Sequence, residues 1–333
     1  MLQVPSAMLI EPSVIWTIDF DRGQASICPP DTIGCRAETG DFRWLHLDLV
    51  DQVTRSWIAG AEGIPDEMRA LLLGTEHHQR FQVADGYLGC VLHDVERDFD
   101  RFDTERTGVL RFVLGPHLMI TARHTPIHSA DLVRRHVERD GVPVRNAADA
   151  LNLLASSIVE NVTTLAREQG RIIEVLEDDL LDERKSFDHR RLIQFRRRVV
   201  QFHRLLSGMR SVFHRMEQDS DMPEPLRPTI EKLAQQVGSV DDEMLSFQSQ
   251  LRLLREEADL QASQRTNQNL YLLSILSAVL LPATLVTGFF GMNTGGLPLA
   301  HGGVGTFIAG LVAVLASAFV YALLRAMGLD RHN

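Results

Sequence analysis

The sequence predicts an α+β cytoplasmic domain that is followed by a long helical stalk and two C-terminal transmembrane helices. Residues 266–324 contain no Asp, Glu, Lys or Arg, whereas the residues before them are densely charged. Residues 146–222 contain no proline and repeat their apolar positions with helical spacing. We therefore expect an α/β domain at 1–145, a stalk at 146–265, and at 266–333 a transmembrane hairpin with a short cytoplasmic tail.

The first part alternates short β-like runs with turns. These runs are rich in β-branched and aromatic residues and are bounded by Gly, Asp or Pro, which is typical of strands. The strands are expected at 14–20, 42–49, 86–95, 108–115 and 117–124. This part is therefore expected to be a mixed α/β domain.

The stalk is expected to consist of long helices. A first amphipathic helix should begin after Asn146 and end at a cluster of prolines, because proline lacks the amide proton and clashes with the preceding turn. The prolines are Pro223, Pro225 and Pro228. A second helix should start near Leu226 and run into the membrane. From Leu226 to Phe290 it would be about 95 Å long.

Two charge blocks lie on the first stalk helix. An acidic block at 174–183 is followed by a basic block at 190–204. Charge runs usually mark solvated helical faces, so one interpretation is a salt-bridged hairpin. The other is that the acidic block collects cations while the basic block gates or repels them.

Two segments are long and apolar enough to span a membrane. Residues 270–290 and 304–324 would each be about 31 Å long as helices, which matches a hydrocarbon core of about 30 Å. Arginines flank the pair, whereas the loop at 291–303 has no Lys or Arg. By the positive-inside rule both termini are cytoplasmic. The start of the chain lacks a signal peptide pattern. The three cysteines are expected to be reduced thiols, and the alternative is a soft-metal site at Cys28 and Cys35.

One side of the first span gathers small and hydroxylic residues. Heptad positions place them in a stripe: Asn267, Ser274, Ser277, Thr284, Gly288 and Gly291. Small residues also allow helices to pack closely in a membrane, which is the alternative interpretation. Because Asn267 and Thr284 are polar, we favour a pore face. Two spans cannot enclose a path for water, so such a pore needs a ring of subunits.

The end of this span is expected to form the mouth of the path. Pro282 should loosen the helix, and Gly288 and Gly291 are further weak points. Met292 and Asn293 follow, and the Asn293 amide oxygen with nearby carbonyls can replace the water shell of a cation.

Histidine is the commonest side chain to bind zinc, and one lies in the loop between the spans. It is His301, and it is either a zinc ligand at the entrance or a solvated residue.

Other function classes lack support in the sequence. The formal net charge of −10 argues against a nucleic-acid partner. There is no phosphate loop, no HExxH and no nucleophile motif, so we expect no enzyme activity and no cofactor. The remaining alternative is a membrane-anchored sensor or scaffold.

The stretch at 281–298 resembles the signature of the CorA superfamily of metal ion transporters. It reads LPATLVTGFFGMNTGGLP and stands at the end of the first of two C-terminal spans, as in that family. The continuation NxGGxP, with no acidic residue in the loop, is similar to the zinc-transporting ZntB branch. Met292 is the residue typical of the magnesium transporters. Residues 44–48 and 172–182 also resemble the family.

The resemblance implies a funnel-shaped homopentamer in the inner membrane, whose first spans line the pore. It implies transport of Zn²⁺, with proton-coupled uptake as the favoured direction and efflux as the alternative. A channel for Mg²⁺, Co²⁺ or Ni²⁺ with the same architecture is the nearest rival. The expected partners are therefore further copies of this chain, the divalent ion and the lipid membrane.

Overall fold

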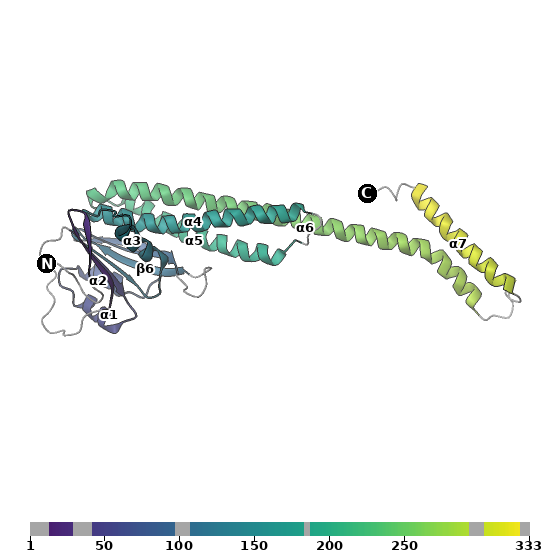
Figure 1. The fold of residues 1–333 in the computed structure, drawn as a ribbon, viewed down its shortest axis with the longest axis horizontal. Helices are drawn as coiled ribbons and strands as arrows, with labels where there is room; N and C mark the ends of the chain where they lie inside the picture. The colour runs from purple at the N-terminus through teal and green to yellow at the C-terminus, as the bar shows by residue number, and fades with distance from the viewer. Residues whose placement is uncertain (1–12, 29–41, 97–106, 183–186, 293–302, 327–333) are drawn as a thin grey trace. The chain divides into compact units, whose positions relative to one another are not determined.

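The computed structural model describes all residues except 1–12, 29–41, 97–106, 183–186, 293–302 and 327–333 (Figure 1). The chain divides into two compact units, Met1–Leu254 and Arg255–Asn333. Each unit is described by itself below.

The first unit is built on a seven-stranded mixed sheet. Its order is β2-β1-β3-β7-β6-β5-β4, and all neighbours are antiparallel except the pair β3 and β7. The strands are β1 (Val14–Asp21), β2 (Gln24–Ile27), β3 (Phe42–Asp48), β4 (Arg80–Ala84), β5 (Tyr87–Val95), β6 (Thr107–Leu114) and β7 (Leu118–Arg123). The five predicted strands are all present.

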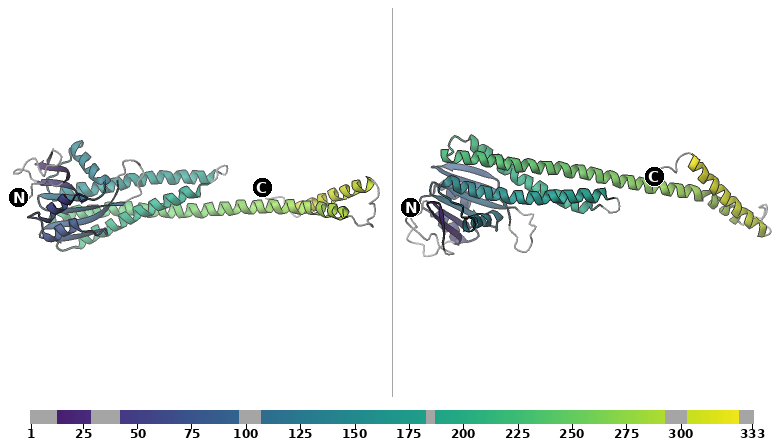
Figure 2. Two further views of the ribbon diagram at one scale, coloured as in Figure 1. Left: turned by 90° about the horizontal axis from the view of Figure 1, so that it is seen from below. Right: turned by 45° about the horizontal axis from the view of Figure 1, so that its top comes forward.

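Helices cover both faces of the sheet. Alternate side chains of a strand point to opposite faces, and one set, which includes Leu45, Val91 and Ile120, packs with the helices α1 (Gln52–Ala59) and α2 (Asp66–Leu73). The opposite side carries α3 (His128–Glu138) and two longer helices, α4 (Ala147–Leu181) and α5 (His189–Gln218). In Figures 1 and 2, α4, α5 and the first part of α6 (Arg227–Gly291) run side by side.

The long helices depart from the expectation at one point. Instead of one helix up to the prolines, α4 ends at Leu181 and α5 begins at His189. The Asp188 carboxylate starts α5 by accepting hydrogen bonds from the backbone amides of Arg190 and Arg191. Arg191 also pairs with Asp179 of α4, at 3.8 Å, so the salt-bridged hairpin is observed at this pair.

The start of the last stalk helix agrees with the prolines. A short 3₁₀ turn, η1 (Glu224–Leu226), leads into α6, which continues through Pro282 to Gly291. The second unit contains the rest of α6 and α7 (Gly303–Ala326). Both helices include a stretch long and apolar enough to cross a membrane.

The expectation for the cysteines is wrong at Cys28. Cys90 is a free, buried thiol, but Cys28 is disulfide-bonded. An odd number of cysteines excludes complete pairing and still permits one bond.

Candidate ion pathway

One side of the membrane part of α6 is partly covered. The half-buried residues recur three or four positions apart, as in Tyr271, Ile275 and Val279. Among the described side chains of α7, the buried ones are Ala309 and Ala313, which are 9% and 6% exposed. Figures 1 and 2 both show α7 (yellow) beside the last part of α6. We infer that these faces pack together, with small α7 residues allowing the close approach that is common between membrane helices.

The predicted polar stripe lies on the uncovered side of α6. Its members are all exposed: Asn267, Ser274, Ser277, Thr284, Gly288 and Gly291. Met292, predicted at the mouth, is exposed as well. At about 100° per residue, the middle of this stripe lies roughly 140° around the helix from the half-buried side. The hairpin therefore leaves this face without cover from its own helices, among the residues that the structure describes.

The hydroxyl groups of the stripe donate to the backbone of their own helix. The Oγ of Ser274 lies 2.8 Å from the Leu270 carbonyl oxygen, and the Oγ1 of Thr284 lies 3.0 Å from that of Leu280. Ser277 makes the same bond. A hydroxyl has one proton and two acceptor lone pairs. Because the proton is used within the helix, each oxygen is left to accept hydrogen bonds from water or to coordinate a cation.

Part of the stripe lines a groove along α6. Ser277, Thr284, Gly288 and Met292 line it together with the leucines 280, 281 and 285 and Phe289. A Cβ atom added at Gly288 or Gly291 would meet no atom within 4 Å. Packing among the described residues thus gives no reason for glycine at either position. A second chain or a ligand close to the backbone would give one.

The expected loosening of the helix does not occur before its end. Pro282 lies inside α6, and the helix continues through Gly288 to Gly291. Proline has no amide proton, so one helical hydrogen bond is missing at Pro282. Pro282 and Ala283 are half-buried, so this side of the helix is partly covered by packing. Asn293 and His301 lie outside the described residues, so the ion-coordinating mouth and the histidine ligand stay predictions.

The chemistry of the stripe is neutral. Residues 266–324 have no Asp, Glu, Lys or Arg. Within the described parts of the chain, no group of three or more His, Cys, Asp or Glu side chains is arranged to hold a metal ion. An ion on this face would therefore meet hydroxyl, amide and carbonyl oxygens, and water.

The stripe brings together most of the predicted residues. Ser277, Thr284, Gly288 and Met292 share the groove, whereas Asn267 and Ser274 lie on the same face nearer the start of the span and outside the groove. Leu281 also lines the groove, and its heptad spacing from Asn267, Ser274 and Gly288 had placed it on this face. Phe289, which lines the groove as well, was not singled out from the sequence.

The chain matches a family of known transporters. The family model described as "CorA-like Mg2+ transporter protein" matches residues 39–325. Two curated relatives are both named "Zinc transport protein ZntB". The protein from Photorhabdus laumondii is 24% identical over 310 residues, which is 90% of each chain, and that from Klebsiella pneumoniae is 25% identical over 328 residues, 94% of each.

Solved structures share the fold. The full-length CmaX protein aligns with a TM-score of 0.77 and 22% identity, covering 96% of this chain and 99% of that one. The CorA magnesium transporter from Methanocaldococcus jannaschii aligns with a TM-score of 0.75 and 16% identity, covering 98% and 99%. This agreement confirms the predicted fold class of an α+β domain, long helices and two C-terminal apolar helices.

Proposed function

The chain belongs to the CorA-like Mg2+ transporter family, and from this premise we propose that it transports zinc ions across the inner membrane. The observation that carries transport is the exposed, uncharged stripe on α6, which lies away from α7 and presents hydroxyl oxygens. The choice of zinc rests on the relatives named as zinc transport proteins, which match along nearly the whole chain.

The pathway requires several copies of the chain. One helix face cannot enclose water, whereas a ring of α6 helices with their stripes turned inward can. We take the ring to be a homopentamer, as the family resemblance implies. Both termini are placed in the cytoplasm, because the arginines flank the hairpin and the loop has none. The mass of the protein in detergent, measured by light scattering, tests the number of subunits.

The proposed direction is uptake, with protons moving together with zinc. The spans carry no carboxylate, so coupling by an intramembrane acid relay is not part of the proposal. Zinc influx into proteoliposomes should rise when the inside is made alkaline. Equal influx with and without the pH gradient would contradict symport and leave zinc transport intact.

Asn293 is proposed to coordinate the ion at the outer mouth, next to Gly291 and Met292. Asn293→Ala should abolish zinc flux in proteoliposomes and leave the oligomer assembled, since only an amide oxygen is lost. Asn269→Ala is the matched control, because it removes the same amide group from an exposed position of α6 that lies off the stripe. Undiminished flux in Asn293→Ala would rule out this assignment.

A magnesium, cobalt or nickel channel is the second candidate. It is favoured by the description of the family and by Met292, which is typical of the magnesium transporters. Competition separates the two: excess Mg²⁺ should leave zinc flux unchanged under our proposal and suppress it under the rival. A sensor or scaffold would show no ion flux with any metal.

A further inference from the structure

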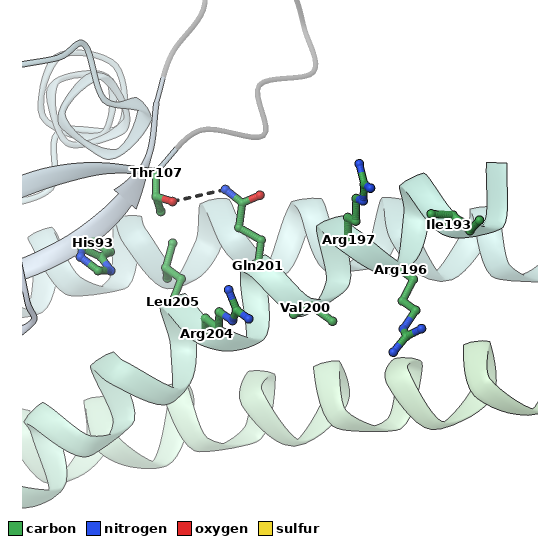
Figure 3. A pocket seen from close by; sticks show the side chains of 9 residues that line it. All are labelled: His93, Thr107, Ile193, Arg196, Arg197, Val200, Gln201, Arg204 and Leu205. Carbon is green, nitrogen blue, oxygen red and sulfur yellow. Dashed lines mark hydrogen bonds between the residues drawn. The ribbon is translucent and has the colours of Figure 1, made fainter. Parts of the chain in front are cut away.

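A second polar feature lies in the first unit, far along the chain from the stripe. A pocket, here called the α5 pocket, forms on α5 where this helix passes the ends of β5 and β6, and its volume is about 660 Å³ (Figure 3). Small-molecule sites typically have volumes of about 300–1,000 Å³. Gln201 of α5 is joined to the sheet here, because its Nε2 donates to Thr107 Oγ1 at 3.3 Å.

Three of the nine residues that line the α5 pocket are apolar, and they are spread along α5. Ile193, Val200 and Leu205 line it along α5. From Ile193 to Leu205 the helix rises about 18 Å. His93 stands at the sheet end, where its ring nitrogen is 2.6 Å from the backbone oxygen of His77. The pocket thus offers a discontinuous apolar strip, with arginines between its members, that ends at the sheet.

Three arginines surround this strip. Figure 3 shows Arg196 and Arg197 leaving α5 on opposite sides of Val200, while Arg204 lies nearer to His93. None of the three forms an ion pair within the described part of the chain. Other arginines of the same helix differ: Arg191 pairs with Asp179 and Arg210 with Asp242 at 2.8 Å. The positive charge of the α5 pocket is therefore uncompensated by these described residues.

We propose that the α5 pocket binds a nucleoside phosphate. Guanidinium groups stay charged and match phosphate oxygens with two parallel hydrogen bonds. The apolar strip suits the flat face of a base, on which a guanidinium can also stack. Arginines on both sides of the strip suit several charged groups in a row better than a single small anion. The site is separate from the polar stripe, so it does not depend on which ion the protein transports.

Binding to the full-length protein in detergent tests this proposal. Calorimetric titrations use ATP, adenosine and inorganic tripolyphosphate, with EDTA present so that no divalent ion takes part. ATP should bind with a Kd below about 1 mM. Adenosine and tripolyphosphate should each bind about tenfold more weakly, because each makes only part of the contacts. Arg204→Ala should weaken ATP binding about tenfold, and adding Arg196→Ala should weaken it further.

The matched control is Arg190→Ala, an exposed arginine on the same helix outside the α5 pocket. It should bind ATP like the parent protein, and all variants should melt at the same temperature. No ATP binding at 1 mM, or unchanged binding in the Arg196→Ala and Arg204→Ala double variant, would overturn the site. Tripolyphosphate binding as tightly as ATP would overturn the nucleoside part. An acidic peptide, titrated in the same way, that binds more tightly than ATP would overturn the ligand class. If the parent protein binds ATP as expected but carries no zinc flux, only the transport proposal is contradicted.

Discussion

The first unit (Met1–Leu254), here called the α/β unit, buries polar side chains, whereas the membrane part of α6 exposes them. In the α/β unit Asp94, His46 and Thr121 are buried, with at most 1% exposed. On α6 the hydroxyls of Ser277 and Thr284 are exposed. In the first case the partners are distant parts of the same chain: the Asp94 carboxylate accepts from the Ser129 amide at 3.0 Å. In the second the only described partner is the helix backbone itself.

The difference shows which part of the protein is complete by itself. A buried polar group is tolerated only when it is hydrogen-bonded, and the α/β unit supplies most of these bonds internally. A polar stripe on a membrane helix is equally unfavourable in lipid, and this chain does not cover it. The α/β unit is therefore expected to be stabilised by its own core. The stripe is expected to need other subunits and water to cover its polar groups.

The largest effect is expected from a cavity in the sheet. Leu45 is fully buried, so Leu45→Ala should lower the free energy of unfolding of the α/β unit by about 3 kcal/mol. Urea unfolding followed by tryptophan fluorescence measures it, because Trp16, Trp44 and Trp57 all lie in this unit. Leu281→Ala is the control, since Leu281 is 67% exposed on α6. Equal loss in both variants would contradict the contrast.

A smaller effect concerns pH. Burial, with the nearby Arg123 charge, lowers the pKa of His46 to about 3. The unfolded chain takes up this proton below its ordinary pKa of about 6.5, and the folded protein does not until about 3, so stability falls as pH falls. We expect a loss of about 2 kcal/mol between pH 7 and pH 5 from this residue.

His46→Gln should remove this part of the pH dependence. The histidine stacks on Trp16 and its Nδ1 is 2.9 Å from Thr121 Oγ1, so the variant has a lower stability at neutral pH. That offset is the same at every pH, and only the slope between pH 7 and pH 5 is compared by urea unfolding. Parallel slopes in the two proteins would show that His46 takes its proton in the folded state.

The smallest effect should come from the stripe. Thr284→Val keeps the shape of the side chain and removes one oxygen, which should reduce zinc flux about tenfold without changing the unfolding of the α/β unit. Thr287→Val is the matched control: Thr287 is also exposed and donates to a backbone oxygen of α6, but lies off the stripe. A similar fall in both variants would mean that the stripe has no special role.

The sequence predicted most of the fold because its periodicities are strong. Five strands and the membrane helices follow from apolar patterns, and η1 and α6 start where the prolines stand. The strands β2 and β4 were missed because their side chains are mostly exposed or half-buried and do not alternate clearly. A turn signal was present for β4: Asp85 and Gly86 have positive φ angles of 50° and 78°, and Asp-Gly is a strong hairpin signal.

The break between α4 and α5 and the α5 pocket were harder to foresee. The break lies in a charged segment with no proline or glycine, and its only sequence signal is the capping residue Asp188. The arginines of the pocket were visible as a basic block. Which of them pair with acidic residues depends on how α4, α5 and α6 pack, and this is not encoded in the spacing along one helix.

The central claim is that the exposed stripe of α6 borders a water-filled path. Single cysteines at Thr284, on the stripe, and at Ala283, half-buried on the side of α7, test it in proteoliposomes with a charged, water-soluble thiol reagent. The reagent should block zinc flux in Thr284→Cys and leave Ala283→Cys and the parent protein active. Equal sensitivity of the two variants, or no block at Thr284→Cys, would contradict the claim.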